Sequence, residues 1–340
     1  MNRCGWQIAR SLAWNEYCVS ALPHSLLTAL PPKLVERGLY PGAFTFHLEH
    51  LLINPNNLAA EFPQTTLDAR LRMRVGFEME YECPGPTPML LSLNIHHSRA
   101  SDLVRPDILV TSPAVPITAY RDLFGNWCSR IVAPAGRLVL RTDALINDSG
   151  QPDVVAPWVM QTPVEYLPES VLVYLLGSRY CETDLLSNIA WQQFGAGPTG
   201  WGRVQAICDF VHQHIEFGYH HARRTRTAWE AFNEGQGVCR DYAHLAITLC
   251  RCMNIPARYC TGYLGDIRIP PIPGPMDFAG WFEAFLGDRW YTFDARNNTP
   301  RIGRVLMARG RDACDVALTS TFGPNTLQRF TVWADEVAMD

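Results

Sequence analysis

The sequence predicts an α+β fold in which a β-sandwich-like region precedes a mixed region built around one buried helix. Short apolar runs separated by turn residues extend from residue 73 to about residue 165, as in a small sandwich. A continuous apolar run follows Cys239 and is long enough for a buried helix, which should end near Pro256. Beyond this proline the pattern returns to strands, with Gly287-Asp288 as the turn of a hairpin.

Composition limits the class of protein. The chain has 340 residues, of which 47% are hydrophobic and 18% charged, and it has no run of 18 apolar residues. These values are typical of a globular protein without a membrane span. The net charge of −4 provides no basic surface for nucleic acid. Eleven cysteines without a CxxC pair, and a start without a clean signal sequence, favour reduced thiols and a cytoplasmic location.

Changes in pattern divide the chain into five segments. The first secure strand begins at Met73, where apolar residues alternate with charged ones through Tyr81. A polar, proline-containing stretch at residues 146–165 separates the β-rich region from the helical part of the chain. The predicted segments are an N-terminal extension (1–72), a β-rich domain (73–165), a helical connection (166–197), a domain carrying the central helix (198–325) and a C-terminal tail (326–340).

Helices are expected on both sides of the boundary near residue 197. Residues 170–180 and 184–194 look helical, and the apolar residues from Val204 to Ile215 fit one helical stripe. The proline-rich stretch from Gly265 to Asp277 is expected to be a surface loop beside the cleft. Its shape cannot be derived from the pattern.

Cys239 is the residue that points most directly to chemistry. It lies at the head of the buried helix, where unpaired backbone N–H groups favour a thiolate over a thiol. A nucleophilic cysteine fits this position. The alternative is a small buried apolar residue, which is the usual role of a free cysteine.

Three motifs carry a resemblance to a known family. GVCRDYAHLAITL, NIPARYCTGYL and DFAGWFEAFLGDRWYTFDAR occur in this order. Over residues 73 to about 325 the chain resembles the transglutaminase-like superfamily, in the bacterial branch with a β-rich N-terminal domain. The resemblance implies a papain-like core, in which a cysteine at the start of the central helix packs against an antiparallel sheet that supplies a histidine and an aspartate. It places the nucleophile at Cys239 and the aspartate at Asp294.

The histidine of this family has no counterpart here. Its position, just before a small residue and a tryptophan, is occupied by Ala279. If Leu286 pairs with Arg289 across the turn, Ala279 is the diagonal neighbour of Asp294, within reach of a long side chain. A methyl group cannot accept a proton, so the triad is incomplete. His221 and His220, in the loop before the cysteine, are the candidate substitute bases, whereas His244 is expected to be a packed, hydrogen-bonded residue.

Two classes of function are consistent with these residues. The first is a thiol enzyme of weak or altered activity, similar to cysteine proteases and transglutaminases, that cleaves or transfers amides through a thioester on Cys239. The second is a catalytically impaired relative that binds a peptide-like ligand. Trp281 and Arg296 are expected at the cleft, with Arg296 paired either with Asp294 or with a substrate carboxylate. A peptide or protein amide is the expected substrate, and no metal, cofactor, nucleic acid or membrane is expected as a partner.

Overall fold

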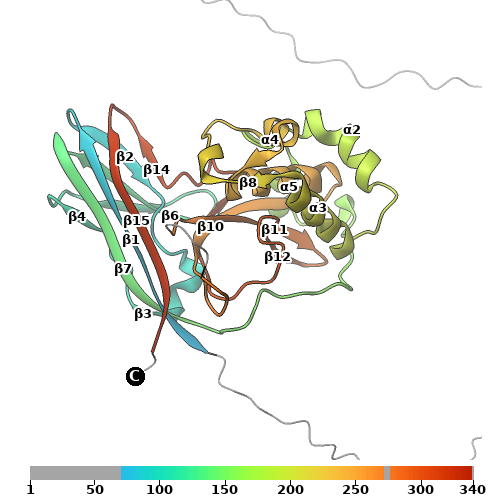
Figure 1. Cartoon of the computed structure of the whole chain (residues 1–340), viewed down its shortest axis with the longest axis horizontal. Coiled ribbons are helices and arrows are strands. Elements are labelled where there is room, and N and C mark those ends of the chain that lie inside the picture. The colour runs from blue at the N-terminus through green and yellow to red at the C-terminus, as the bar shows by residue number, and fades with distance from the viewer. Residues whose placement is uncertain (1–69, 272–275, 339–340) are drawn as a thin grey trace, which may run out of the picture. The chain divides into compact units, whose positions relative to one another are not determined.

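The computed structural model describes residues 70–271 and 276–338, which all belong to one compact unit spanning residues 65–340 (Figure 1). The predicted N-terminal extension lies outside the described residues except for its last three. The fold is a mixture of antiparallel sheets and helices, which confirms the α+β prediction. Among the described residues no helix is long and apolar enough to cross a membrane, and the cytoplasmic location stays a prediction.

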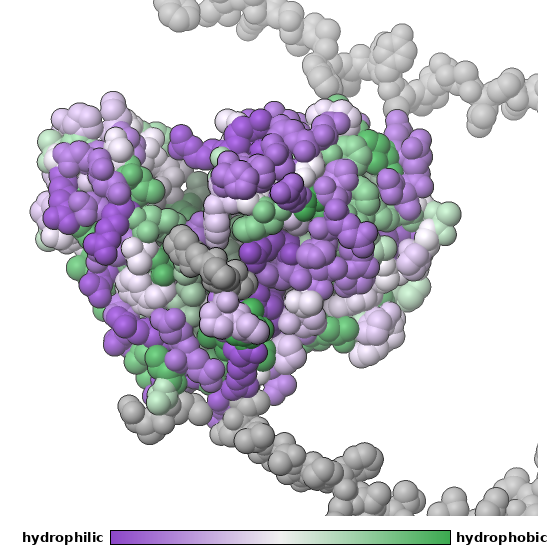
Figure 2. All heavy atoms as spheres, in the orientation of Figure 1, coloured by the Kyte–Doolittle hydropathy of each residue, from purple (hydrophilic) through white to green (hydrophobic). Residues whose placement is uncertain are grey.

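The largest sheet joins the two ends of the described chain. Strand β1 (Leu71–Cys83) pairs with β7 (Gly136–Asp148) on one side and with β15 (Thr326–Val337) on the other, and both pairings are antiparallel. β3 (Leu103–Arg105) and β4 (Val110–Ser112) extend the sheet along β7. The apolar residues predicted to alternate from Met73 to Tyr81 are all buried, as expected for a strand with one covered face. Hydrophilic residues run along the visible side of this sheet in Figure 2.

A second sheet covers the apolar face of the first. Its order is β14 (Thr319–Thr321), β2 (Thr87–Leu91), β6 (Trp127–Ala133) and β5 (Thr118–Arg121). The apolar side chains of both sheets form one core. Tyr263, Val305 and Met307 from the other half of the molecule enter the same core. The sandwich and the helical half therefore share buried surface.

The helical half is built around α5 (Cys239–Cys252). Twelve of its fourteen residues are buried, in agreement with the predicted central helix. α2 (Thr183–Phe194), α3 (Trp201–His214) and α4 (Ala228–Glu234) pack around it (Figure 1). The stretch predicted as a helix at 170–180 forms only the short α1 (Glu169–Leu172) and a 3₁₀ turn at Val173–Leu175. α5 ends where Asn254 takes a left-handed conformation before Pro256.

A four-stranded antiparallel sheet packs against α5. Its order is β12 (Arg289–Phe293), β11 (Ala279–Leu286), β10 (Ala257–Leu264) and β13 (Arg304–Gly310). Leu286 pairs with Arg289, so the predicted hairpin register is confirmed. Two short strands, β8 (Glu216–Phe217) and β9 (Gln236–Gly237), pair in parallel just before α5. This arrangement brings the start of α5 close to the start of β11.

Candidate active site

Cys239 is the first residue of α5, and a buried polar cluster fixes the turn that leads into it. Asp241 Oδ2 accepts hydrogen bonds from the backbone N–H of Val238 at 3.0 Å and from the Arg226 guanidinium at 3.1 Å. Gly237 lies so close to Asp241 that an added Cβ would be 2.7 Å from the Asp241 Cβ. A glycine is therefore needed two residues before the cysteine.

Cys239 borders a cavity of about 390 Å³. Cys239 is partly exposed as a residue, and the backbone N–H of Gly280 donates a hydrogen bond to its sulfur. The cavity combines apolar walls with charged groups of both signs. Its lining comes from the β8 region, the start of α5, the end of β10 and the segments around β11 and β12: Phe217, Gly218, Tyr219, Cys239, Leu264, Asp266, Met276, Asp277, Phe278, Ala279, Gly280, Arg296, Asn297 and Arg301.

The thiol of Cys239 is not poised as a thiolate, contrary to the expectation from its place at a helix N-terminus. Burial raises its pKa to about 11, and the negative charge of Asp277 acts in the same direction. The Gly280 N–H and the positive charge of Arg296 oppose this shift without reversing it. Burial of the sulfur raises the thiol pKa by more than the helix N-terminus lowers it. The resting side chain of Cys239 is therefore a thiol.

Asp294 follows β12 and is fully engaged by other groups. Its carboxylate forms a 2.8 Å ion pair with Arg304 and accepts hydrogen bonds from the Asn297 backbone N–H at 3.0 Å and side-chain amide at 2.7 Å. Burial alone would raise its pKa, but the charge of Arg304 and the Asn297 hydrogen bonds lower it. Asp294 is thus held as a carboxylate that is poorly suited to accept a proton.

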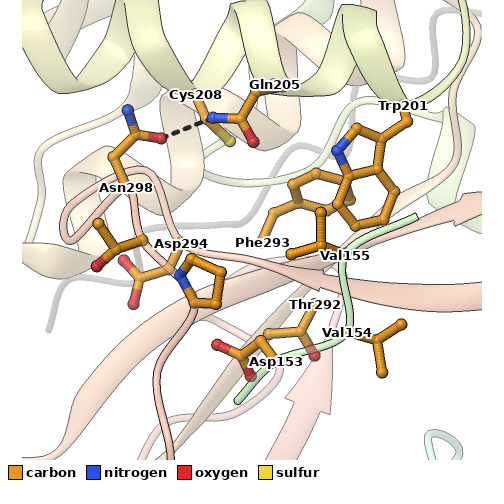
Figure 3. Close-up of a pocket in the computed structure, with 12 residues that line it drawn as sticks. Asp153, Val154, Val155, Trp201, Gln205, Cys208, Thr292, Phe293, Asp294 and Asn298 are labelled. Atoms are coloured by element: carbon orange, nitrogen blue, oxygen red, sulfur yellow. Dashed lines mark hydrogen bonds between the residues drawn. The ribbon is translucent and has the colours of Figure 1, made fainter. Parts of the chain in front are cut away.

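Asp294 faces a second, smaller cavity instead of the one beside Cys239. This cavity of about 180 Å³ lies between α3, residues 153–155 and the end of β12 (Figure 3). Gln205 donates to Asn298 at 3.0 Å across it. Among the described residues, Asn297 connects the two spaces, because it lines the larger cavity while bonding Asp294.

Ala279, at the position of the family histidine, lines the Cys239 cavity. It is the first residue of β11, where its backbone pairs with Gly262. The structure thus places the cysteine and the alanine at one cavity. Asp294 remains behind Asn297.

Trp281 and Arg296 occupy different environments. Trp281 is only 3% exposed, and the Arg304 guanidinium lies 5.1 Å from its ring centroid, so it packs beneath the ion pair and does not line the cavity. Arg296 does line the cavity, with its guanidinium 4.2 Å from the centroid of the Phe217 ring. The expected alternative of an Arg296–Asp294 pair is wrong, because Arg304 takes that place and Arg296 donates to Asn297 at 2.9 Å.

The three histidines considered from the sequence, His220, His221 and His244, are not among the described residues that line the Cys239 cavity. The rings of His220 and His221 are tilted by 46° with centroids 3.8 Å apart and pack against Gly218. His244 lies between the rings of Tyr180 and Tyr259 and accepts a hydrogen bond from the Ala313 N–H at 3.1 Å. Burial lowers its pKa well below the usual value.

Sequence reasoning missed two groups at the cavity. Asp277 belongs to the loop before β11, and Tyr219 to the 3₁₀ turn at Tyr219–His221. Burial raises the pKa of both side chains, and for Tyr219 the neighbouring charges of Asp277 and Cys239 add to the effect. The sequence offered no period at either position, because Asp277 precedes β11 and Tyr219 lies in a 3₁₀ turn.

Comparisons with known proteins agree with this geometry. The model of the transglutaminase-like superfamily matches residues 189–295, which include Cys239, Ala279 and Asp294. An uncharacterised protein of Mycobacterium leprae is 33% identical over 91 residues, which are 26% of this chain and about a third (32%) of that protein. A crystal structure from Cytophaga hutchinsonii, named a "putative cysteine protease", superposes with a TM-score of 0.68 at 28% identity, covering 80% of this chain and 92% of that one. Residues 189–295 of this chain therefore form a domain of the transglutaminase-like superfamily.

Proposed function

We propose that the protein is a thiol-dependent amide hydrolase or acyltransferase that acts through a thioester on Cys239. The observation that carries the proposal is the position of Cys239, a partly exposed residue at the start of α5 that lines a cavity of about 390 Å³. The similarity to a protein named as a cysteine protease supports the same class of reaction.

The reaction begins with attack of the Cys239 sulfur on a substrate carbonyl carbon. The sulfur–carbon bond forms, the thiol proton leaves, and the carbon–nitrogen bond breaks as the departing amine takes up a proton. Water then releases an acid, or a second amine forms a new amide. The backbone N–H groups of Cys239 and Arg240 begin α5, where N–H groups have no intrahelical partner, so they are suited to stabilise the oxyanion.

The lining of the cavity favours a peptide-like substrate. Phe217, Leu264, Met276 and Phe278 provide apolar walls, while Arg296 and Arg301 provide positive charge at one part of the lining. Such a mixture suits an amide that carries an apolar side chain and a nearby carboxylate. A peptide or protein amide is the proposed substrate.

A second candidate is a binding protein without turnover. It is favoured by the alanine at position 279, by a thiol whose pKa is raised to about 11, and by an Asp294 carboxylate held by Arg304. In this case the same cavity would bind a peptide-like ligand without forming a covalent bond.

One experiment separates the two candidates. The purified protein is treated with 4-nitrophenyl acetate, and intact-mass and peptide mass spectrometry are used to locate an acyl group. A thiol enzyme gives an acetyl thioester on Cys239 that disappears with time and is not formed by Cys239→Ala. The absence of any adduct on Cys239 in the wild type, across the pH range in which the protein is folded, would falsify the enzymatic proposal.

A further inference from the structure

The cavity beside Cys239 contains a carboxylate that the family pattern does not account for. Asp277, Phe278 and Ala279 all line it, and Phe278 also belongs to the core of the sandwich. The Phe278 ring packs in the sandwich core, 5.9 Å from the centroid of Phe77 and 5.1 Å from that of Tyr263. Asp277 therefore lies two residues before the position of the family histidine and borders the same cavity as Cys239.

Asp277 is the charged group that acts most strongly on the sulfur. Among the charges that influence Cys239, that of Asp277 exceeds those of Arg296 and Asp294. Asp277 and Cys239 both contribute to the raised pKa of Tyr219, and all three residues line the same cavity. Asp277 lines the cavity beside Cys239, whereas Asp294 lines the second cavity.

The carboxylate is held in place from one side. The backbone N–H of Phe278 donates a hydrogen bond to Asp277 Oδ1 at 2.6 Å. Among the described residues, this is the only hydrogen bond that Asp277 receives. The buried ring of Phe278 anchors this donor. Asp294 is the contrasting case, because an ion pair and two hydrogen bonds occupy its carboxylate.

We infer that Asp277 replaces the absent histidine as the proton-accepting group for Cys239, an inference that rests on the proposed function. As the sulfur attacks the carbonyl carbon, the thiol proton moves to the Asp277 carboxylate. The resulting carboxylic acid then donates that proton to the departing nitrogen as the carbon–nitrogen bond breaks. No electron is gained or lost overall, and Asp277 returns to its ionised form.

The protonation behaviour of Asp277 is consistent with this role. Burial raises the pKa of its carboxyl, while the Phe278 N–H opposes the shift. A carboxylate with a raised pKa is a stronger base, so the difference between its pKa and that of the thiol is smaller. The other charged or titratable groups that line the cavity are Tyr219, Asp266, Arg296 and Arg301.

The test compares two reactions of the same thiol. Iodoacetamide reports only the thiolate fraction, whereas acylation by 4-nitrophenyl acetate is assisted by a neighbouring base. Removing the Asp277 charge in Asp277→Asn lowers the thiol pKa, so alkylation should become faster. Proton acceptance predicts that acylation near neutral pH becomes slower. A merely structural or electrostatic role cannot move the two rates in opposite directions.

The pH profile gives a second readout. With Asp277 as base, the wild-type acylation rate should be flat above the pKa of Asp277 until the thiolate itself appears. The Asp277→Asn rate should rise about tenfold per pH unit, so its deficit shrinks by about 100-fold between pH 7 and pH 9. Asp277→Glu should keep the flat profile. Asp288→Asn, in the exposed β11–β12 turn, serves as the matched control and should behave as wild type.

The outcomes distinguish this inference from the proposed function. A Cys239 thioester that forms at a rate rising tenfold per pH unit already in the wild type would overturn the role of Asp277 and leave the proposed function standing. This readout does not depend on whether Asp277→Asn folds. A wild type that never acylates at Cys239 would overturn both. Opposite changes in alkylation and acylation in Asp277→Asn would establish the role.

Discussion

Asp294 and Arg304 form a 2.8 Å ion pair whose side chains are only 5% and 8% exposed. In the family pattern the aspartate is the partner of a histidine. In this chain the carboxylate forms an ion pair with an arginine from β13 instead. Arg304 also binds Asp153 at 2.8 Å, so it links the end of β12 to the connection between the two halves. The aspartate has thus become part of the buried framework beneath the cavity.

Replacing Arg304 by methionine should destabilise the protein. The change leaves the Asp294 charge buried without its partner, which costs about 3–5 kcal/mol of unfolding free energy. Urea unfolding at pH 7 measures the loss. Arg137→Met is the matched control, because Arg137 pairs with Glu80 at 2.8 Å with 64% of its side chain exposed. This control should cost less than about 1 kcal/mol.

The Asp294–Arg304 ion pair also predicts how the loss of unfolding free energy in Arg304→Met depends on pH. The folded pKa of Asp294 is lowered, so its contribution to stability is fully present above the unfolded pKa of about 3.9 and is lost as pH falls through the folded value. In Arg304→Met, burial of the Asp294 carboxyl group becomes the main influence on its pKa and favours the protonated form. The difference between wild type and Arg304→Met should therefore shrink as pH falls from 7 towards 3. A difference that does not change with pH would contradict this account.

Ala279→His should add a base to the cavity. Residue 279 lines the space beside Cys239, so an imidazole there can accept the thiol proton. Acylation by 4-nitrophenyl acetate should rise about tenfold at pH 7.5, with a new inflection near pH 6.5. The gain should stay below the 10²–10⁴-fold of an oriented base, because Arg304 holds Asp294. Ala279→Asn is the control, and equal rates for both variants would show that the imidazole does not reach the sulfur.

The alkylation rate of Cys239 should follow a raised pKa. With a pKa of about 11, the thiolate fraction grows about tenfold per pH unit between about pH 7 and pH 10. Iodoacetamide labelling, resolved by peptide mass spectrometry, measures the rate at this cysteine. A curve that levels off below about pH 8.5 would mean that the helix end outweighs burial.

The parts of the fold that the sequence predicted are those set by local pattern. Alternation identified β1, the apolar run identified α5, and the two-residue turn determined that Leu286 pairs with Arg289. The pairing of β15 with β1 was not predicted, because it joins opposite ends of the described chain. Nothing in a local period specifies which distant strand completes a sheet.

The candidate site also contains features that the sequence predicted and features that it did not. Cys239 and Ala279 were identified from motifs, and the structure brings both to one cavity. The Asp294–Arg304 pair depends on two strands meeting, and the raised thiol pKa depends on how much water the fold excludes. Asp277 went unnoticed because its proline-rich loop has no period from which a facing side could be predicted.

The turn before Cys239 should depend on the buried pair of Asp241 and Arg226. Their side chains are 0% and 3% exposed, with 3.1 Å between the charged atoms. Asp241→Asn keeps an oxygen for the Val238 N–H but removes the charge opposite Arg226. The cost should be about 2–3 kcal/mol, at the low end for a broken buried pair, because Glu234 still binds Arg226 at 3.0 Å.

A double variant tests whether this cost belongs to the pair. If the two charges stabilise one another, Asp241→Asn combined with Arg226→Met should cost less than the sum of the single changes, by about 0.5–3 kcal/mol. Acylation of Cys239 should fall in both single variants, since the turn that presents the sulfur loses its anchor. Asp335→Asn, at an exposed position of β15, should change neither stability nor acylation. Strictly additive costs would show that the two side chains stabilise the turn independently.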